Sequence, residues 1–212
     1  MFPCIKPFVS PLQCSLALLL LTVLPARAQP AAAESDVEVT SVHFSPVPAP
    51  SGALTKNNWL EVNVEVNVKA TPATQENRNF LNRVKMTVTL GFQVTVDKNK
   101  LSFYRASAEA VSLEVGRSNF RFYVPGEIVK RDSLAGEAKY YAVELAVGGK
   151  ALTPQKSNYS TSSIPNLQTF LSKAAGDSSS NDGIMLPQFL TGYAFDNNRP
   201  SPTIVRPEAM AK

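Results

Sequence analysis

The chain has 212 residues, a formal net charge of +4, one histidine and two cysteines. Zinc sites and histidine- or cysteine-dependent catalysis draw on these scarce residue types, so the composition argues against both. The length is sufficient for a domain with a hydrophobic core of its own.

The first 28 residues have the features of a secretory signal peptide. Lys6 supplies a basic start, an apolar run extends from Ser15 to Leu24, and Ala26-Arg27-Ala28 forms a small-x-small cleavage site. The run is shorter than the roughly 20 apolar residues that a membrane-spanning helix needs. We therefore expect cleavage after Ala28. Cys14 precedes the apolar run, which argues against a lipid anchor.

Cleavage would change the chemistry of the remaining chain of about 184 residues. Cys4 and Cys14 would both be removed, so we expect no disulfide in the mature protein. Lys6 and Arg27 would leave as well but no acidic residue would, which lowers the net charge to about +2, with 19 basic against 17 acidic residues. This charge gives no reason to expect a nucleic-acid partner. The expected location is the periplasm, the outer membrane or the cell surface, with no transmembrane segment after cleavage.

The mature chain divides into three predicted parts. Residues 29–36 are expected to form a flexible lead, residues 37–152 a β-sandwich domain, and residues 153–212 a C-terminal extension. The extension is expected to contain one short helix around residues 164–174, followed by an irregular tail. Ser162-Ser163-Ile164-Pro165 resembles a helix start, because serine caps helices and proline favours the first turn.

Alternation of apolar and polar residues is the strongest signal in the predicted sandwich. From Trp59 to Lys69 it continues for five cycles, which predicts a half-buried strand. A second long strand is expected over residues 84–96. Shorter strands are expected over 37–44, 101–104, 111–115, 120–124, 140–147 and 150–152, with a hairpin connection at 116–119. These closely spaced strands predict an all-β fold, an antiparallel two-sheet immunoglobulin-like β-sandwich.

The residue sets of common catalytic sites are absent from the sequence. The only histidine, His43, lies in a predicted strand between Val42 and Phe44 and has no partner motif. This favours a strand histidine at a sheet edge over a catalytic base. The chain also contains neither a Gly-x-Ser-x-Gly elbow nor a phosphate-binding glycine loop. We expect no enzyme activity and no cofactor.

Three groups of acidic and amide residues are candidates for a metal or catalytic site. Asp177 to Asp182 and Asp196 to Asn198 offer oxygen ligands, but neither segment fits the calcium loop of an EF-hand, and solvated loop residues explain both. Glu61 and Glu65 share the outward face of one predicted strand, about 13 Å apart, which is too far for a glycosidase pair. We interpret them as solubilising charges and predict no metal site.

Three tyrosines suggest a binding surface. Tyr104, Tyr123 and Tyr140 each alternate with apolar neighbours in short strands, so all three are expected to point away from the core. Together with Arg121 they would form a patch that binds a protein partner or a glycan, if their strands are neighbours. Alternatively, aromatic residues of the C-terminal extension cover this face, and the tyrosines are then structural.

Three segments carry a resemblance to a known family: Phe103-Tyr-Arg-Ala-Ser-Ala-Glu109, Arg121-Phe-Tyr-Val-Pro-Gly-Glu-Ile-Val-Lys-Arg-Asp132 and Tyr140-Tyr-Ala-Val-Glu-Leu145. In these segments the chain resembles the secreted immunoglobulin-like β-sandwich protein encoded in type IV pilus-like gene clusters of verrucomicrobial gut bacteria. The resemblance covers most of residues 37–152. It implies an immunoglobulin-like sandwich outside the inner membrane, with a role in a surface filament or outer-membrane assembly. It supplies no catalytic residues, and the chain lacks the long N-terminal helix of a prepilin, which leaves an accessory or adhesive role.

The expected function is therefore that of a non-catalytic structural or adhesive component of a bacterial cell-surface assembly, pilus-associated or at the outer membrane. It would act by edge-strand or face pairing with envelope or pilus-like proteins, or with copies of itself. The alternative is a glycan-binding or protein-binding β-sandwich module of the periplasm or cell surface.

Overall fold

The computed structural model describes residues 35–94, 100–134 and 136–205. The predicted signal peptide, most of the predicted lead and the end of the C-terminal extension lie outside these residues. No described helix combines the length and the apolar character needed to cross a membrane.

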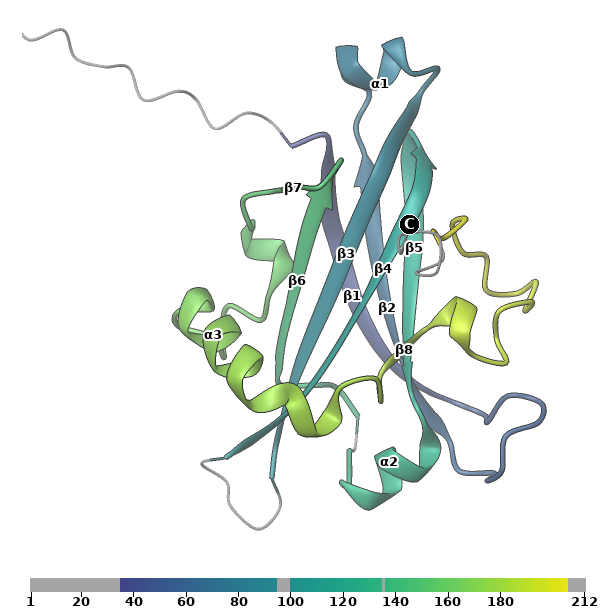
Figure 1. Cartoon of the computed structure of the whole chain (residues 1–212), viewed down its shortest axis with the longest axis vertical. Coiled ribbons are helices and arrows are strands. Elements are labelled where there is room, and N and C mark those ends of the chain that lie inside the picture. The colour runs from purple at the N-terminus through teal and green to yellow at the C-terminus, as the bar shows by residue number, and fades with distance from the viewer. Residues whose placement is uncertain (1–34, 95–99, 135, 206–212) are drawn as a thin grey trace, which may run out of the picture. The chain divides into compact units, whose positions relative to one another are not determined.

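The described strands form two four-stranded antiparallel sheets (Figure 1). The first sheet has the order β1-β2-β5-β8, with the bounds β1 Val37–Val47, β2 Trp59–Val68, β5 Gly116–Val124 and β8 Leu186–Pro187. The second sheet has the order β4-β3-β6-β7, with the bounds β3 Phe80–Gln93, β4 Leu101–Glu114, β6 Tyr140–Val147 and β7 Lys150–Ala151. This arrangement confirms the predicted antiparallel β-sandwich.

The strand order is that of an immunoglobulin-like sandwich with one strand moved. In the constant-type fold the first, second, fifth and fourth strands share a sheet, and the third, sixth and seventh form the other. Here β4 pairs with β3 in the second sheet, and β8 from the C-terminal extension takes the place beside β5. A segment far along the chain thereby completes the first sheet.

Alternation fixes which face of β2 is buried. Val62, Val64 and Val66 are fully buried between the sheets, whereas Asn63 and Glu65 on the other face are partly exposed. The register places Val64 between Val42 of β1 and Phe120 of β5. The five-cycle pattern in the sequence therefore predicts both the strand and its orientation.

The predicted break in the middle of β4 is wrong. Residues 101–114 form one continuous strand, in which Ala106, Ala108 and Ala110 face the core and Arg105 and Ser107 face outward. Alanine has low strand propensity, so this alternation is easily missed in the sequence. The small side chains still fit here because they pack against the larger residues of the opposite sheet.

The predicted hairpin at residues 116–119 is also wrong. β4 and β5 lie in different sheets, and the chain crosses between them immediately after Val115. Gly116 makes this crossing with a φ of 113°, a conformation that favours glycine.

The helices are short and lie outside the sheets. They are α1 Pro72–Glu76, α2 Gly126–Arg131, α3 Leu167–Asp177 and the 3₁₀ turns η1 Lys156–Asn158, η2 Ser178–Asn181 and η3 Gln188–Leu190. The sequence predicted a helix around 164–174; α3 begins later because Asn166, and not a serine, caps it, with its side-chain oxygen accepting a hydrogen bond of 2.9 Å from the N–H of Thr169.

Hydrophobic side chains pack in three separate layers. The largest cluster lies between the two sheets and includes Met86, Leu90, Phe120 and Phe122. A second cluster lies on the outer face of the second sheet, under α3. A third lies on the outer face of the first sheet, under the C-terminal extension. Both outer faces are thus partly covered by residues 153–205.

The short strand β7 pairs with only the end of β6, and the C-terminal extension binds the rest of that edge. The Nδ2 of Asn158 donates a hydrogen bond of 3.1 Å to the carbonyl of Val143. The N–H of Ser160 donates one of 3.1 Å to the carbonyl of Tyr141. Backbone groups that would otherwise accept a foreign strand are therefore satisfied within the chain.

The same extension covers parts of β4 and β5. The N–H of Val111 donates to the carbonyl of Thr203 at 2.8 Å, and the N–H of Val205 donates to the carbonyl of Glu109 at 2.7 Å. Nearer the start of β4, the Nδ2 of Asn181 donates to the carbonyl of Phe103 at 2.9 Å. β8 pairs with the outer edge of β5. The extension thus binds three of the four long edges of the sandwich.

Replacement of Gly126 by alanine should destabilise the fold. A Cβ at this position would lie 2.4 Å from the carbonyl oxygen of Asn57, so the backbone would have to move. We expect the free energy of unfolding to fall by roughly 1–3 kcal/mol, measured by urea denaturation. The control is Gly176→Ala in α3, where a Cβ meets no atom within 4 Å and a gain of up to about 1 kcal/mol is expected. Equal effects of the two changes would contradict the prediction.

Candidate functional site

The structure separates the four residues of the predicted binding patch. Tyr104 is fully buried between the two sheets, Tyr123 and Arg121 lie on the outer face of the first sheet, and Tyr140 lies on the outer face of the second. No common surface contains all three tyrosines. Their role in binding stays a prediction, but the shared patch does not form because β4 and β5 belong to different sheets.

The predicted orientation of Tyr104 is wrong. Its ring faces the core and contacts Phe92 edge-on, with the ring centroids 5.9 Å apart, whereas Phe103 faces outward and packs against Phe170 of α3. Both faces of the strand start are apolar, so the sequence pattern did not distinguish them. The hydroxyl of Tyr104 reaches Asp132, and burial and this hydrogen bond raise the pKa of Tyr104 to about 12.

Tyr140 is partly buried beside α3. It belongs with Phe103 and Phe170 to the cluster on the outer face of the second sheet, and Lys139 lies 5.5 Å from its ring centroid. A Cβ at Gly91 would lie 3.2 Å from the Cβ of Tyr140 and 3.3 Å from a ring carbon of Phe170, so glycine at this position allows α3 to pack closely here. Much of the Tyr140 side chain therefore serves the packing of α3.

Tyr123 and Arg121 point outward as predicted, but the C-terminal extension covers them. Tyr123 is fully buried, and its ring stacks on Tyr193 at 4.4 Å between centroids. The Nη1 of Arg121 donates to the carbonyl of Pro200 at 2.5 Å. At these two residues the structure matches the alternative in which the extension packs on the sheet.

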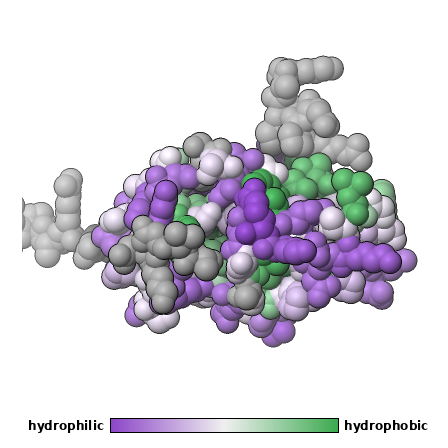
Figure 2. All heavy atoms as spheres, turned by 90° about the horizontal axis from the view of Figure 1, so that it is seen from below, coloured by the Kyte–Doolittle hydropathy of each residue, from purple (hydrophilic) through white to green (hydrophobic). Residues whose placement is uncertain are grey.

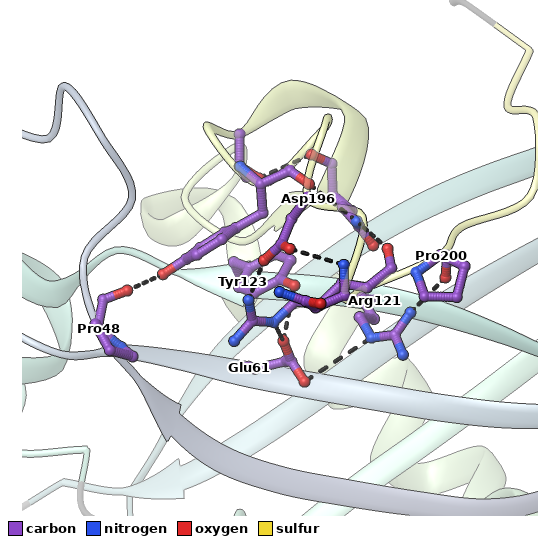
Figure 3. A network of polar contacts seen from close by, with 11 residues as sticks. Pro48, Glu61, Arg121, Tyr123, Asp196 and Pro200 are labelled. Atoms are coloured by element: carbon purple, nitrogen blue, oxygen red, sulfur yellow. Dashed lines mark hydrogen bonds and ion pairs between the residues drawn. The ribbon is translucent and has the colours of Figure 1, made fainter.

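A buried carboxylate lies at the centre of this covered face (Figure 3). The Oε2 of Glu61 accepts hydrogen bonds from the hydroxyl of Tyr123 at 2.7 Å and from the Nε of Arg199 at 3.0 Å. Its Oε1 lies 3.9 Å from the Nε of Arg121. We call Glu61, Arg121, Tyr123, Tyr193, Asp196 and Arg199 the Glu61 network.

The interpretation of Glu61 as a solubilising charge is therefore corrected. Its residue exposure is only 8%, because the extension lies over it. Two arginines and a tyrosine hydroxyl compensate its charge, as burial of a carboxylate requires. The sequence did not reveal this role, since Arg199 is 138 positions away.

Tyr193 fixes the extension to the same face. Its ring lies between Tyr123 and Trp59, with centroid distances of 4.4 and 6.0 Å. Arg199 lies over the Tyr193 ring at 5.2 Å, and the Tyr193 hydroxyl donates to the carbonyl of Pro48. The Nε2 of Gln188 holds the loop from inside by donating to the carbonyls of Tyr193 and Arg199 at 3.0 and 2.7 Å.

The loop from residue 188 to residue 204 lines an open hollow of about 720 Å³. Its lining includes Phe195, Leu190, Asn197 and Arg199. Phe195 is 94% exposed and Leu190 56% exposed. Figure 2 shows hydrophobic atoms at the surface on the right-hand side of the view from below, next to hydrophilic ones. An exposed aromatic ring beside polar groups is suited to contact a ligand.

Metal binding has no clear location in the described residues. They contain no group of three or more His, Cys, Asp or Glu side chains that could hold an ion. Of the calcium candidates, Asn181 uses its side chain to bind Ser102 and Phe103, and Asp196 pairs with Arg199.

β1 is the only long edge strand with which the described part of the extension forms no backbone hydrogen bond. Between Ser41 and Pro46, no described residue outside β2 forms a backbone hydrogen bond with it. The turn η1 approaches β1 from the other sheet without such a bond. His43 lies on this strand with its side chain exposed. We call the outer edge of residues 41–45 the β1 edge.

Comparisons with known proteins identify a fold relative. No protein-family model matches the chain, and no curated protein matches it. Among solved structures, a crystal structure of a protein from Akkermansia muciniphila, a verrucomicrobial bacterium, is similar with a TM-score of 0.59 and 16% sequence identity. The match covers 81% of this chain and 93% of that chain. At this identity the likeness shows a shared fold.

Removal of the Glu61 carboxylate should weaken the packing of the C-terminal extension on the first sheet. Glu61→Ala leaves Arg199 and Arg121 without their shared partner, so we expect the free energy of unfolding to fall by about 2–4 kcal/mol. The matched control is Glu65→Ala on the same strand face, where the side chain is 26% exposed and the expected change is within about 1 kcal/mol. Urea unfolding of both variants measures the difference, and a Glu61 variant as stable as the control would contradict it.

Four tyrosines should ionise at a higher pH than a free tyrosine side chain. Burial raises the pKa of Tyr104, Tyr123, Tyr141 and Tyr193 above 10.0, and in Tyr123 the hydrogen bond to Glu61 adds to it. Because the unfolded chain ionises first, the free energy of unfolding is unaffected by these groups below pH 10 and decreases as the pH rises from 10 toward 12. Absorbance of tyrosinate, followed with Tyr104→Phe and Tyr123→Phe variants, tests this. Ionisation of all six tyrosines near pH 10 in the folded protein would refute it.

Proposed function

We propose that this protein is a non-catalytic structural or adhesive component of a bacterial cell-surface assembly, associated with a pilus-like structure or the outer membrane. The observation that carries the proposal is the distribution of sheet edges. The extension binds the edges of β4, β5 and β6, whereas the β1 edge forms no backbone hydrogen bond with any described residue outside β2. An uncovered edge is the usual place where a partner strand adds to a sheet.

Three further observations support the proposal. The fold is shared with a protein from a verrucomicrobial bacterium. The N-terminal 28 residues have the pattern of a signal peptide, which would bring the chain out of the cytoplasm. The partly buried Val42 and Phe44 along the β1 edge offer apolar surface that an added strand would cover.

A second candidate function is glycan binding at the hollow formed by the extension. The observation in its favour is Phe195, which is almost fully exposed at the hollow and provides an aromatic face of the kind that stacks on sugar rings. In this case the protein acts as a binding module, and the β1 edge has no role.

Fractionation of cells that carry a tagged chain tests the assembly proposal. We expect the protein in the envelope fraction, with envelope proteins that co-purify after mild cross-linking. Substitution of Val42 by proline, which disturbs the β1 edge, should reduce this recovery, whereas Phe195→Ala should not. The opposite result, with glycan-array binding that is lost in Phe195→Ala, would favour the glycan-binding module and contradict the assembly role.

A further inference from the structure

The β1 edge is bounded by two interruptions at equal distances from His43. The register with β2 shifts between Val39 and Ser41, so Thr40 lies in a bulge. On the other side, Pro46 has no N–H to donate. Between them, residues 41–45 form five regular positions, close to the common length of a strand in a sheet.

This symmetry makes the edge complementary to a second copy of itself. If two β1 edges pair antiparallel about His43, then Ser41 lies opposite Ser45, and Thr40 lies opposite Pro46. Each interruption then meets the interruption of the other copy, where neither chain can continue the ladder. A single two-fold axis relates the two edges, as in most soluble dimers.

The side chains match in the same register. Residues directly opposite each other in an antiparallel pair point to the same face. Val42 therefore lies opposite Phe44, on the face that packs on the core, and the polar residues lie on the outer face. Phe44 already contacts Tyr141 at 5.7 Å between ring centroids and remains partly exposed. A second β1 would cover its exposed part.

The charges do not oppose this pairing. The only Lys, Arg, Asp or Glu in β1 is Glu38, which pairs with Lys69 at 3.1 Å and lies outside the five positions. The part of β5 that does not pair with β8 differs, because it carries Arg117 and Arg121. Self-pairing there about Asn119 would place these arginines opposite each other, which is unfavourable.

We propose that the partner of the β1 edge is a second copy of this chain, joined by antiparallel pairing of residues 41–45 about His43. The two first sheets then form one continuous sheet across the contact. This inference rests on the proposed function, because it names the partner of the edge through which the assembly role would operate.

Single cysteines test the register, because residues 29–212 contain no cysteine of their own. The full-length chain is produced by export, with mass measurement to verify that residues 1–28 are removed. Paired residues have Cα atoms about 4.5–5.5 Å apart, within the span of a disulfide. His43→Cys should therefore form a disulfide-linked dimer under mild oxidation.

Ser41→Cys and Ser45→Cys are the matched controls. Each alone should remain monomeric on non-reducing gels, since equivalent cysteines would lie about 13 Å apart along the strands. A mixture of the two variants should form a mixed dimer, and its rate should exceed that of either variant alone by about tenfold or more. Light scattering of the unmodified protein over a concentration series should show a dimer.

A His43→Cys chain that stays monomeric under oxidation, or a Ser41→Cys chain that dimerises as fast, overturns the pairing. If cross-linking fails while envelope proteins still co-purify with the chain, the self-pairing is wrong and the assembly role is retained. If both fail, the assembly role is wrong as well.

Discussion

The packing of the C-terminal extension on the first sheet depends on the buried carboxylate of Glu61. A carboxylate in this position would be unfavourable without compensation, and Arg199, Arg121 and the hydroxyl of Tyr123 provide it. Arg199 belongs to the C-terminal extension, so the charge of β2 and the position of the extension depend on each other. Stacking of Tyr193 on Tyr123 adds an apolar contact at the same place.

From this contact the extension continues to the sheet edges. As a result, the edges on the two sides of the sandwich differ in how far the extension binds them. β8, the turn at Asn181 and the backbone of residues 203–205 close the side formed by β4 and β5. Residues 156–160 close β6. On the opposite edge of the first sheet, the backbone of β1 between its bulge and Pro46 bonds to β2 alone among the described residues. Among the long edge strands in the described part of the chain, only β1 lacks a backbone partner on its outer side, which would direct association to a single site and limit uncontrolled aggregation.

The sequence predicted well what depends on local alternation. β2 has large β-branched residues on one face and polar residues on the other, so both its existence and its orientation could be predicted. β4 could not be predicted in full, because its buried face carries alanines. At its start, Phe103 and Tyr104 also place an aromatic side chain on each face of the strand. Prediction of the candidate site was less successful. The distribution of strands between the sheets separates Tyr104 from Tyr123, and the partner of Glu61 is a distant arginine in an irregular segment.

The position of the extension at the end of the chain has a consequence for biogenesis. A ribosome completes β1 to β7 before it adds residues 181–205, so the edges of β4 and β5 are open while these last residues are still missing. Unpaired strands in a growing chain are prone to wrong association. Truncations that remove residues 181–205 also remove β8, and they should therefore aggregate although β1 to β7 are still present.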